Sequence, residues 1–231
     1  MADQPGPKAT SLSYQVPLRI RLARRWMRPV FRLLFHLLCR VKVTGRENVP
    51  AKGPYLIAAN HISLFEPPLI LAFWPVPAEA VSATDVWERG GQGWLVTLYG
   101  AIPVHRGEYD RRLLDTMVAA LRAGRPLLIA PEGGRSHTLG LRRGMPGIAY
   151  VVQKSGACIV PVGIVGTTDD FFKKAVRGER RLLEMRIGKP FHLPAEDPGE
   201  DTRRAIRQKQ ADFIMHRIAE LLPPEYWGVY G

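Results

Sequence analysis

A histidine and a glutamate five positions apart follow the first strongly apolar run of the central part of the chain. The run Tyr55–Ala59 has the length and composition of a buried strand, and it is followed directly by Asn60 and His61. Glu66 precedes two prolines and an apolar series, and proline is favoured in the first turn of a helix. A histidine on a strand-to-helix loop, with a carboxylate at the helix start, suits a general base whose second ring nitrogen is held by an acid. We therefore predict that His61 and Glu66 form a catalytic pair.

The spacing of this pair is weak support by itself. Three of the six histidines have an acidic residue five positions downstream, and in two of them, His105 with Asp110 and His192 with Asp197, that residue is aspartate. The position of His61 between a strand and a helix is what distinguishes it. We interpret the spacing of His105 and Asp110 as coincidental.

A second polar cluster, at residues 131–136, follows the apolar run at residues 126–130. Two adjacent glycines, Gly133 and Gly134, let backbone N–H groups approach an anion closely. Arg135 adds a planar fork that can grip a phosphate, and Ser136 adds a further donor. Glu132 repels phosphate, so we expect it to orient Arg135 or to accept a hydrogen bond from a substrate hydroxyl. An ordinary glycine turn with a surface arginine is the alternative.

The charge and cysteine content limit the class of partner and the compartment. The chain has 231 residues, with 33 basic against 21 acidic residues and a net charge of +12. This charge predicts a polyanionic partner, either an anionic membrane surface or nucleic acid. Two cysteines provide neither a disulfide framework nor a metal cluster, which fits a reducing, cytosolic setting. Arginines interrupt the early apolar runs, so we expect neither a signal peptide nor a membrane-spanning helix.

Residues 17–40 favour the membrane over nucleic acid as the partner. Arginines recur every three or four residues and fall on one side of a helix, while the other side carries apolar residues including Trp26. This composition is typical of a helix that lies in a membrane interface, with Pro29 producing a kink. A helix that packs on its own domain with the arginines facing water is the alternative. A basic nucleic-acid-binding protein is disfavoured because no nucleic-acid motif accompanies the charge.

Alternating apolar runs and amphipathic segments predict one α/β domain with a mixed, largely parallel sheet flanked by helices. We divide the chain into a disordered N-terminus (residues 1–16), an amphipathic membrane-surface helix (17–40) and a catalytic domain (41–231). Within the domain we expect strands at residues 41–44, 55–59, 80–83, 126–130 and 158–165, one just before Arg106 and one ending at 186–188. Helices are expected after the prolines at 67 and 68 and at residues 108–123, 146–154 and 202–222.

Four blocks in this order resemble the glycerolipid acyltransferase family, whose type member is 1-acylglycerol-3-phosphate acyltransferase. They read NHISLFEPP, GAIPVHRG, APEGGRS and IVPVGI, and the closing LLPPEYWGVYG is similar to tails of bacterial members. The resemblance implies that His61 is the base and Glu66 its orienting acid. It also implies acceptor-phosphate binding by Arg106, Glu132, Gly133, Gly134, Arg135 and Ser136. The block around Pro161 corresponds to the acyl-donor region.

This resemblance predicts transfer of a fatty acyl group from acyl-coenzyme A or acyl-carrier protein to the hydroxyl of 1-acylglycerol-3-phosphate. No metal or other cofactor is required, and the expected location is the cytoplasmic face of a membrane, as a peripheral protein. Two departures from the family pattern matter: Glu66 stands where aspartate is usual, and Gly134 where threonine is usual. The second leaves the acceptor open, so glycerol 3-phosphate, another lysophospholipid or an acylated amino acid lipid are alternatives.

Overall fold

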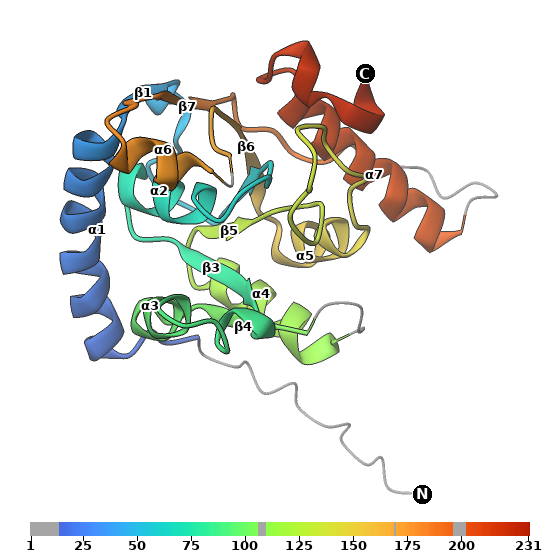
Figure 1. The fold of residues 1–231 in the computed structure, drawn as a ribbon. Coiled ribbons are helices and arrows are strands. Elements are labelled where there is room, and N and C mark those ends of the chain that lie inside the picture. The colour runs from blue at the N-terminus through green and yellow to red at the C-terminus, as the bar shows by residue number, and fades with distance from the viewer. Residues whose placement is uncertain (1–13, 106–109, 169, 196–201) are drawn as a thin grey trace, which may run out of the picture.

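Seven strands form one mixed sheet in the order β1-β7-β6-β2-β5-β3-β4 (Figure 1). The computed structural model describes residues 14–105, 110–168, 170–195 and 202–231. All neighbouring strands run parallel except β6 and β7, which are antiparallel. The predicted α/β fold with a largely parallel sheet is confirmed. The strands are β1 Arg40–Thr44, β2 Tyr55–Ala59, β3 Glu79–Ala83, β4 Ile102–Val104, β5 Leu127–Ile129, β6 Cys158–Val165 and β7 Leu182–Ile187.

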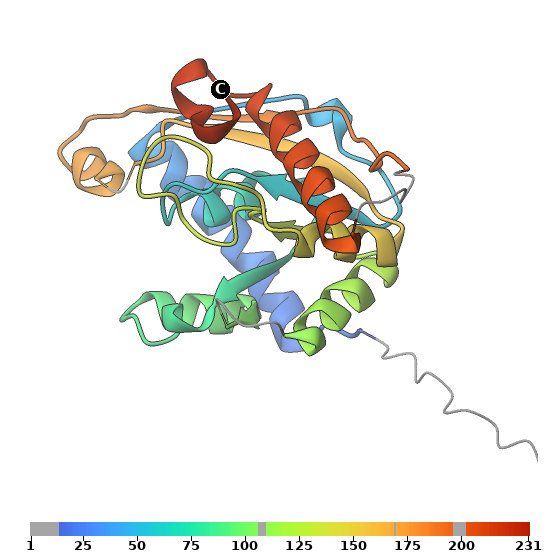
Figure 2. The ribbon, with the colours of Figure 1, turned by 90° about the vertical axis from the view of Figure 1, so that its right-hand side faces the viewer.

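Helices cover both faces of the sheet. Figure 2 shows α7 in front of the sheet and α1 behind it. One apolar core lies between the sheet and α1, α2 and α6, and a second lies between the sheet and α4, α5 and α7. The helices are α1 Leu18–Leu38, α2 Glu66–Phe73, α3 Gln92–Tyr99, α4 Arg111–Arg122, α5 Gly147–Ser155, α6 Phe171–Val176 and α7 Arg203–Ala219, with short 3₁₀ turns at Arg46–Asn48, Thr84–Val86, Pro224–Tyr226 and Gly228–Tyr230.

The continuous apolar run of β2 follows from its position inside the sheet. Successive side chains of a strand point to opposite faces. Leu56 and Ala58 accordingly pack in the core beneath α4, α5 and α7, whereas Tyr55, Ile57 and Ala59 pack against the opposite helices. All five residues are buried, because helices cover both faces.

Three neighbouring parallel strands end at the same edge of the sheet. β2 pairs with β5 on one side and with β6 on the other, and both pairs are parallel. The loops that follow these strands therefore meet at one edge. In open α/β sheets, ligands bind outside the carboxyl ends of the strands. The segments after β2 and β5 carry the first and third sequence blocks, and β6 itself carries the fourth.

Helix α1 packs on the domain through part of its arginine face. Arg24 is buried and forms a bidentate ion pair with Glu79 of β3, with nitrogen–oxygen distances of 2.7 and 2.6 Å. Its Nε also donates to the backbone oxygen of Tyr99, and Arg28 and Arg32 donate to backbone oxygens at the end of α2. The last carbonyls of a helix have no partner within that helix. The arginines of α1 supply partners at the ends of α2 and α3.

The outward face of α1 is therefore mostly apolar. Trp26 is 71% exposed, and the same face carries further exposed apolar side chains: Leu18, Leu22, Val30, Leu33, Leu34 and Leu37. Arg19, Arg21 and Arg25 are also exposed. The alternative reading of the sequence, in which the helix packs with its arginines facing water, is wrong for Arg24, which is buried. The helix continues through Pro29 from Leu18 to Leu38.

Only part of the predicted division of the chain can be compared with the structure. Most of the predicted disordered N-terminus, and the predicted start of the helix at residue 108, lie outside the described residues. Within the described part, Tyr14 donates a hydrogen bond of 2.8 Å to Glu79, and α1 packs against α2 and α3. Helices α3 and α6 are additional to those that the sequence predicted.

Candidate active site

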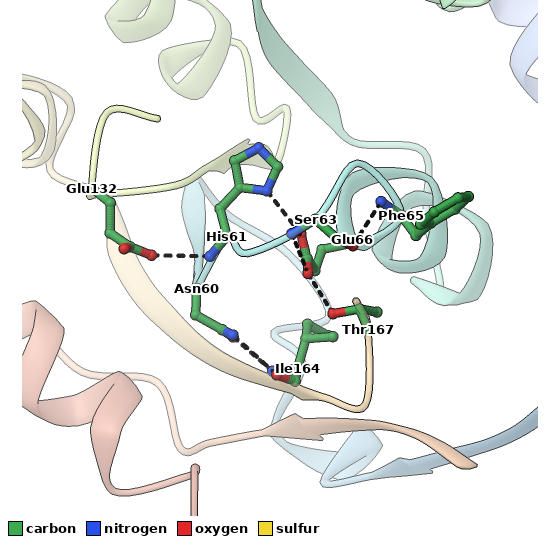
Figure 3. A network of polar contacts seen from close by, with 8 residues as sticks. All are labelled: Asn60, His61, Ser63, Phe65, Glu66, Glu132, Ile164 and Thr167. Carbon is green, nitrogen blue, oxygen red and sulfur yellow. Dashed lines mark hydrogen bonds and ion pairs between the residues drawn. The ribbon is translucent and has the colours of Figure 1, made fainter. Parts of the chain in front are cut away.

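The loop between β2 and α2 brings His61 and Glu66 into contact. Nδ1 of His61 lies 2.9 Å from Oε2 of Glu66, and the other ring nitrogen points away from the carboxylate (Figure 3). Glu66 is the first residue of α2, where the positive end of the helix dipole stabilises a negative charge. The Glu66 side chain is 1% exposed, and that of His61 is 15% exposed. The pair has the geometry of a buried orienting acid with an accessible imidazole.

Two further donors contact the carboxylate of Glu66. The backbone N–H of Ser63 lies 2.9 Å from each carboxylate oxygen. The hydroxyl of Thr167, in the segment after β6, donates to Oε1. Thr167 is not among the site residues predicted from the sequence. Its only sequence signal is its position two residues after the end of the β6 run.

Asn60 ties the end of β2 to β6. Its amide nitrogen donates to the backbone oxygen of Ile164 over 3.0 Å, and its amide oxygen accepts from the backbone nitrogen of Ile164 over 2.7 Å (Figure 3). The Asn60 amide thus makes the two hydrogen bonds to β6 that another residue of β2 would make through its backbone if the strand continued. This clamp fixes the start of the loop that carries His61.

The backbone of His61 is held by the segment after β5. Its N–H donates to Oε1 of Glu132 over 3.0 Å, and its carbonyl accepts from the N–H of Ser136 over 2.7 Å. The second oxygen of Glu132 accepts from the N–H of Arg142 over 2.9 Å. Burial raises the pKa of Glu132, while these two backbone hydrogen bonds lower it. Glu132 therefore joins the histidine loop to the loop that contains Arg142.

The other residues of the third block lie on the same turn. Gly133 has a φ of +69°, and a Cβ there would come within 2.9 Å of Met145, which explains the need for glycine. Gly134 and Arg135 border the cavity described below, as His61 does. The hydroxyl of Ser136 is engaged with its own loop, since it donates to the backbone oxygen of Gly140 over 2.9 Å.

Arg106 and Pro161 are the remaining predicted site residues, and Asp110 belongs to the histidine–acid spacing interpreted as coincidental. Arg106 lies outside the described residues. Pro161 is buried within β6 opposite Ala58, and its carbonyl accepts from the N–H of Gly188. It therefore lies in the sheet below the strand ends that carry His61. Asp110 caps α4 by accepting from the N–H of Leu113, which accounts for it as a helix-capping residue.

A mostly apolar cavity of about 480 Å³ adjoins the pair of His61 and Glu66, here called the dyad. His61, Glu66 and Arg135 border it together with apolar side chains from α1, α2, β3, α3 and α4, among them Phe31 and Leu71. Its size falls within the range of small-molecule sites, which combine apolar walls with a few polar groups. The arrangement can place an apolar chain beside an imidazole and an arginine.

A family model described as Acyltransferase matches residues 40–165, which is more than half of the chain. The chain belongs to the acyltransferase family. The match spans the segments that carry His61, Glu66, Glu132 and Arg135, and it confirms the resemblance seen in the sequence.

Relatives and a solved structure agree with this membership. The chain is 29% identical over 206 residues to a lyso-ornithine lipid O-acyltransferase of Pseudomonas aeruginosa, covering 82% of this chain and 77% of the relative. It is 27% identical over 179 residues to a 1-acyl-sn-glycerol-3-phosphate acyltransferase of Bacillus subtilis, covering 73% and 85%. The fold matches the crystal structure of PlsC, a 1-acyl-sn-glycerophosphate acyltransferase from Thermotoga maritima, with a TM-score of 0.62 at 22% identity, covering 87% of this chain and 80% of that one.

Proposed function

We propose that this acyltransferase moves a fatty acyl group from an acyl thioester to the hydroxyl of 1-acylglycerol-3-phosphate. The contact of His61 with Glu66 beside an apolar cavity is the observation that carries the proposal. The donor is acyl-coenzyme A or acyl-carrier protein, and the product is a diacyl phospholipid precursor. The reaction is thus O-acylation in phospholipid biosynthesis.

His61 acts as the general base. With a proton on Nδ1 donated to Glu66, Nε2 has a free lone pair for the acceptor hydroxyl proton. The alkoxide attacks the thioester carbonyl, and the tetrahedral intermediate expels the thiolate. The thiolate then takes the proton from the imidazolium, so the products are the ester, the free thiol and the neutral histidine. Glu66 holds the tautomer and stabilises the imidazolium.

Arg135 and the backbone N–H groups near Gly133 and Gly134 hold the anionic head group of the acceptor. Arg135 and His61 both border the cavity, which supports a role for the arginine in binding the acceptor that the base deprotonates. A guanidinium grips a phosphate or a carboxylate bidentately. Arg106 completes this site in the proposal, as the family pattern implies. The acceptor is thereby oriented rather than activated, and orientation itself contributes to the rate.

An acceptor other than 1-acylglycerol-3-phosphate is the second candidate. The Pseudomonas aeruginosa relative, which matches 82% of this chain, is named for lyso-ornithine lipid. Gly134 also lacks the hydroxyl that threonine offers at this position in the usual family pattern. A lyso-ornithine lipid, another lysophospholipid or glycerol 3-phosphate each presents a hydroxyl and an anionic group, so the same mechanism applies.

The outward face of α1 binds the membrane that supplies the lipid substrate. No helix within the described residues is long and apolar enough to cross a bilayer. The exposed apolar stripe that includes Trp26 suits insertion into one leaflet, and the exposed Arg21 and Arg25 suit contact with anionic head groups. Leu34 is 44% exposed and also borders the cavity, so a lipid chain could pass from the bilayer to the dyad. We place the protein on the cytoplasmic face, as a peripheral protein.

Acceptor competition tests the proposed function. Purified protein is incubated with palmitoyl-coenzyme A and equal amounts of lysophosphatidate, lyso-ornithine lipid, lysophosphatidylglycerol and glycerol 3-phosphate, and the acylated products are identified by mass spectrometry. The proposal predicts phosphatidate as the main product. Acylation of lyso-ornithine lipid instead would establish the second candidate, and free palmitate without an acylated lipid would contradict acyl transfer.

A further inference from the structure

The segment after β6 supplies a hydroxyl to the carboxylate that holds the histidine. Thr167 is fully buried, with 0% of its surface exposed, and its Oγ1 donates to Oε1 of Glu66. His61 contacts the opposite oxygen, Oε2 (Figure 3). The two contacts together fix the rotation of the carboxylate about its last bond. A buried hydroxyl that points at a charged group is a specific feature, since burial of a polar group is costly without a partner.

We propose that Thr167 is a positioning residue for the catalytic pair. This inference rests on the proposed function, because it assigns Thr167 a role through Glu66 and His61. Removing the hydroxyl would leave the carboxylate held on Oε1 by Ser63 alone, whose N–H is shared between both oxygens. The carboxylate would then rotate more freely, and the imidazole would spend less time with its Nε2 aimed at the acceptor hydroxyl.

The segment that carries Thr167 is itself firmly placed. The neighbouring Gly166 donates its N–H to the hydroxyl of Tyr226 over 3.1 Å, and Tyr226 is buried in the second core. On the β2 side, Asn60 bonds both backbone groups of Ile164, three residues before Thr167. The backbone that carries Thr167 is thus held on one side by Asn60, at the end of β2, and on the other by the C-terminal segment.

The presence of glutamate at position 66 agrees with this role. The carboxylate of Glu66 reaches both His61 and Thr167, which come from different strand ends. An aspartate, shorter by one methylene, would withdraw from at least one of these contacts. The segment that follows the fourth sequence block therefore serves the base through Thr167, a role separate from any contact of the block itself with the acyl donor.

The chain contains a matched control in the next residue. Thr168 also places its hydroxyl against a carboxylate, that of Asp170, but neither group contacts the catalytic pair in the described contacts. Thr167→Val and Thr168→Val are therefore the same chemical change, one residue apart. Thr167→Ser retains a hydroxyl and serves as the conservative variant.

Steady-state kinetics with varied acceptor and donor test the role of Thr167. We expect Thr167→Val to lower kcat by about tenfold to a hundredfold, the range for losing a hydrogen bond to a charged group, with both KM values unchanged. Thr168→Val should retain full activity, and Thr167→Ser should recover most of kcat. In a Glu66→Gln background the Val substitution should cost less than about threefold, because the carboxylate that it serves is gone.

Three results would overturn the inference while leaving acyl transfer intact: an unchanged kcat for Thr167→Val, a rise in KM alone, or the same loss in the Glu66→Gln background as in the wild type. Thermal unfolding of each variant is measured alongside. If Thr167→Val does not fold, Thr167→Ala replaces it in the same comparison. Failure of the proposed function is distinguishable, because it would appear in the wild type as an absence of acylated product with every acceptor.

Discussion

The backbone N–H of His61 donates to Oε1 of Glu132 over 3.0 Å, so an acidic residue of the third block supports the histidine through its peptide and not through its ring. Oε2 of Glu132 accepts from the backbone of Arg142. Both carboxylate oxygens therefore accept hydrogen bonds from backbone N–H groups, and Glu132 as a whole is 2% exposed. This geometry favours a positioning role for Glu132 over direct contact with the acceptor.

The substitution Glu132→Gln tests that role. A glutamine has one oxygen that can accept, so it cannot serve both N–H groups. We expect kcat to fall by about tenfold to a hundredfold because the histidine loop shifts, while the acceptor KM stays unchanged. Glu225→Gln, at an exposed glutamate of the C-terminal segment, is the control and should behave as wild type. A rise in the acceptor KM with constant kcat would favour direct binding instead.

Replacing Arg135 should change the acceptor KM, whereas replacing Glu132 should change kcat. Its guanidinium is proposed to bind the acceptor head group, so Arg135→Ala should raise the acceptor KM by about tenfold or more, the loss expected for a hydrogen bond to a charged group. The KM for the acyl donor should not change. Arg143→Ala is the control, because Arg143 is exposed and pairs with Asp212 at 3.7 Å. Equal acceptor KM values for wild type and Arg135→Ala would exclude this residue from the head-group site.

The outward face of α1 predicts how the protein binds vesicles. Trp26→Asp should weaken sedimentation with phosphatidylglycerol vesicles strongly, because it places a charge within the apolar stripe. Val229→Asp makes a similar change at a 67% exposed apolar residue of the C-terminal segment and should have no effect. Replacing Arg21 or Arg25 by alanine should weaken binding by about 1 kcal/mol each, or about fivefold, and less at high salt. Equal binding of Trp26→Asp and Val229→Asp would show that α1 does not meet the membrane.

The buried pair of Arg24 and Glu79 predicts a large stability effect. Arg24→Met leaves the carboxylate of Glu79 buried without its main partner, so the free energy of unfolding should fall by about 3–5 kcal/mol. Adding Glu79→Met should restore much of this loss, because the two charges are then removed together. Chemical denaturation of the single and double variants measures both values. Additive losses would mean that the ion pair is not what couples α1 to β3.

The strands at the centre of the sheet could be predicted from the sequence because both of their faces are buried, which requires an uninterrupted apolar run. Tyr55–Ala59 and Cys158–Val165 are apolar throughout and match the predicted strands residue for residue. Helix α3 was not predicted because its eight residues include Gly93 and have no clear apolar period. Helix α6 has only six residues, too few to show a period.

The orientation of α1 could not be predicted, because the partners of its arginines are distant in sequence. Arg24 pairs with Glu79, 55 residues away, and Arg32 with the carbonyl of Ala72, 40 residues away. A helical pattern shows which residues share a face, but not which face meets the domain. The same limit applies to the site: His61 and Glu66 are close in sequence and were predicted, whereas Thr167 lies 101 residues from Glu66 and was not.

The most direct test of the central claim is thiol release from palmitoyl-coenzyme A, with and without oleoyl-lysophosphatidate, in wild type and His61→Ala. General-base catalysis contributes typically about 10²- to 10⁴-fold, so the variant should lose nearly all acceptor-dependent release while unfolding at the wild-type temperature. If His61→Ala instead released thiol with acceptor at a near-normal rate, His61 would not be the base.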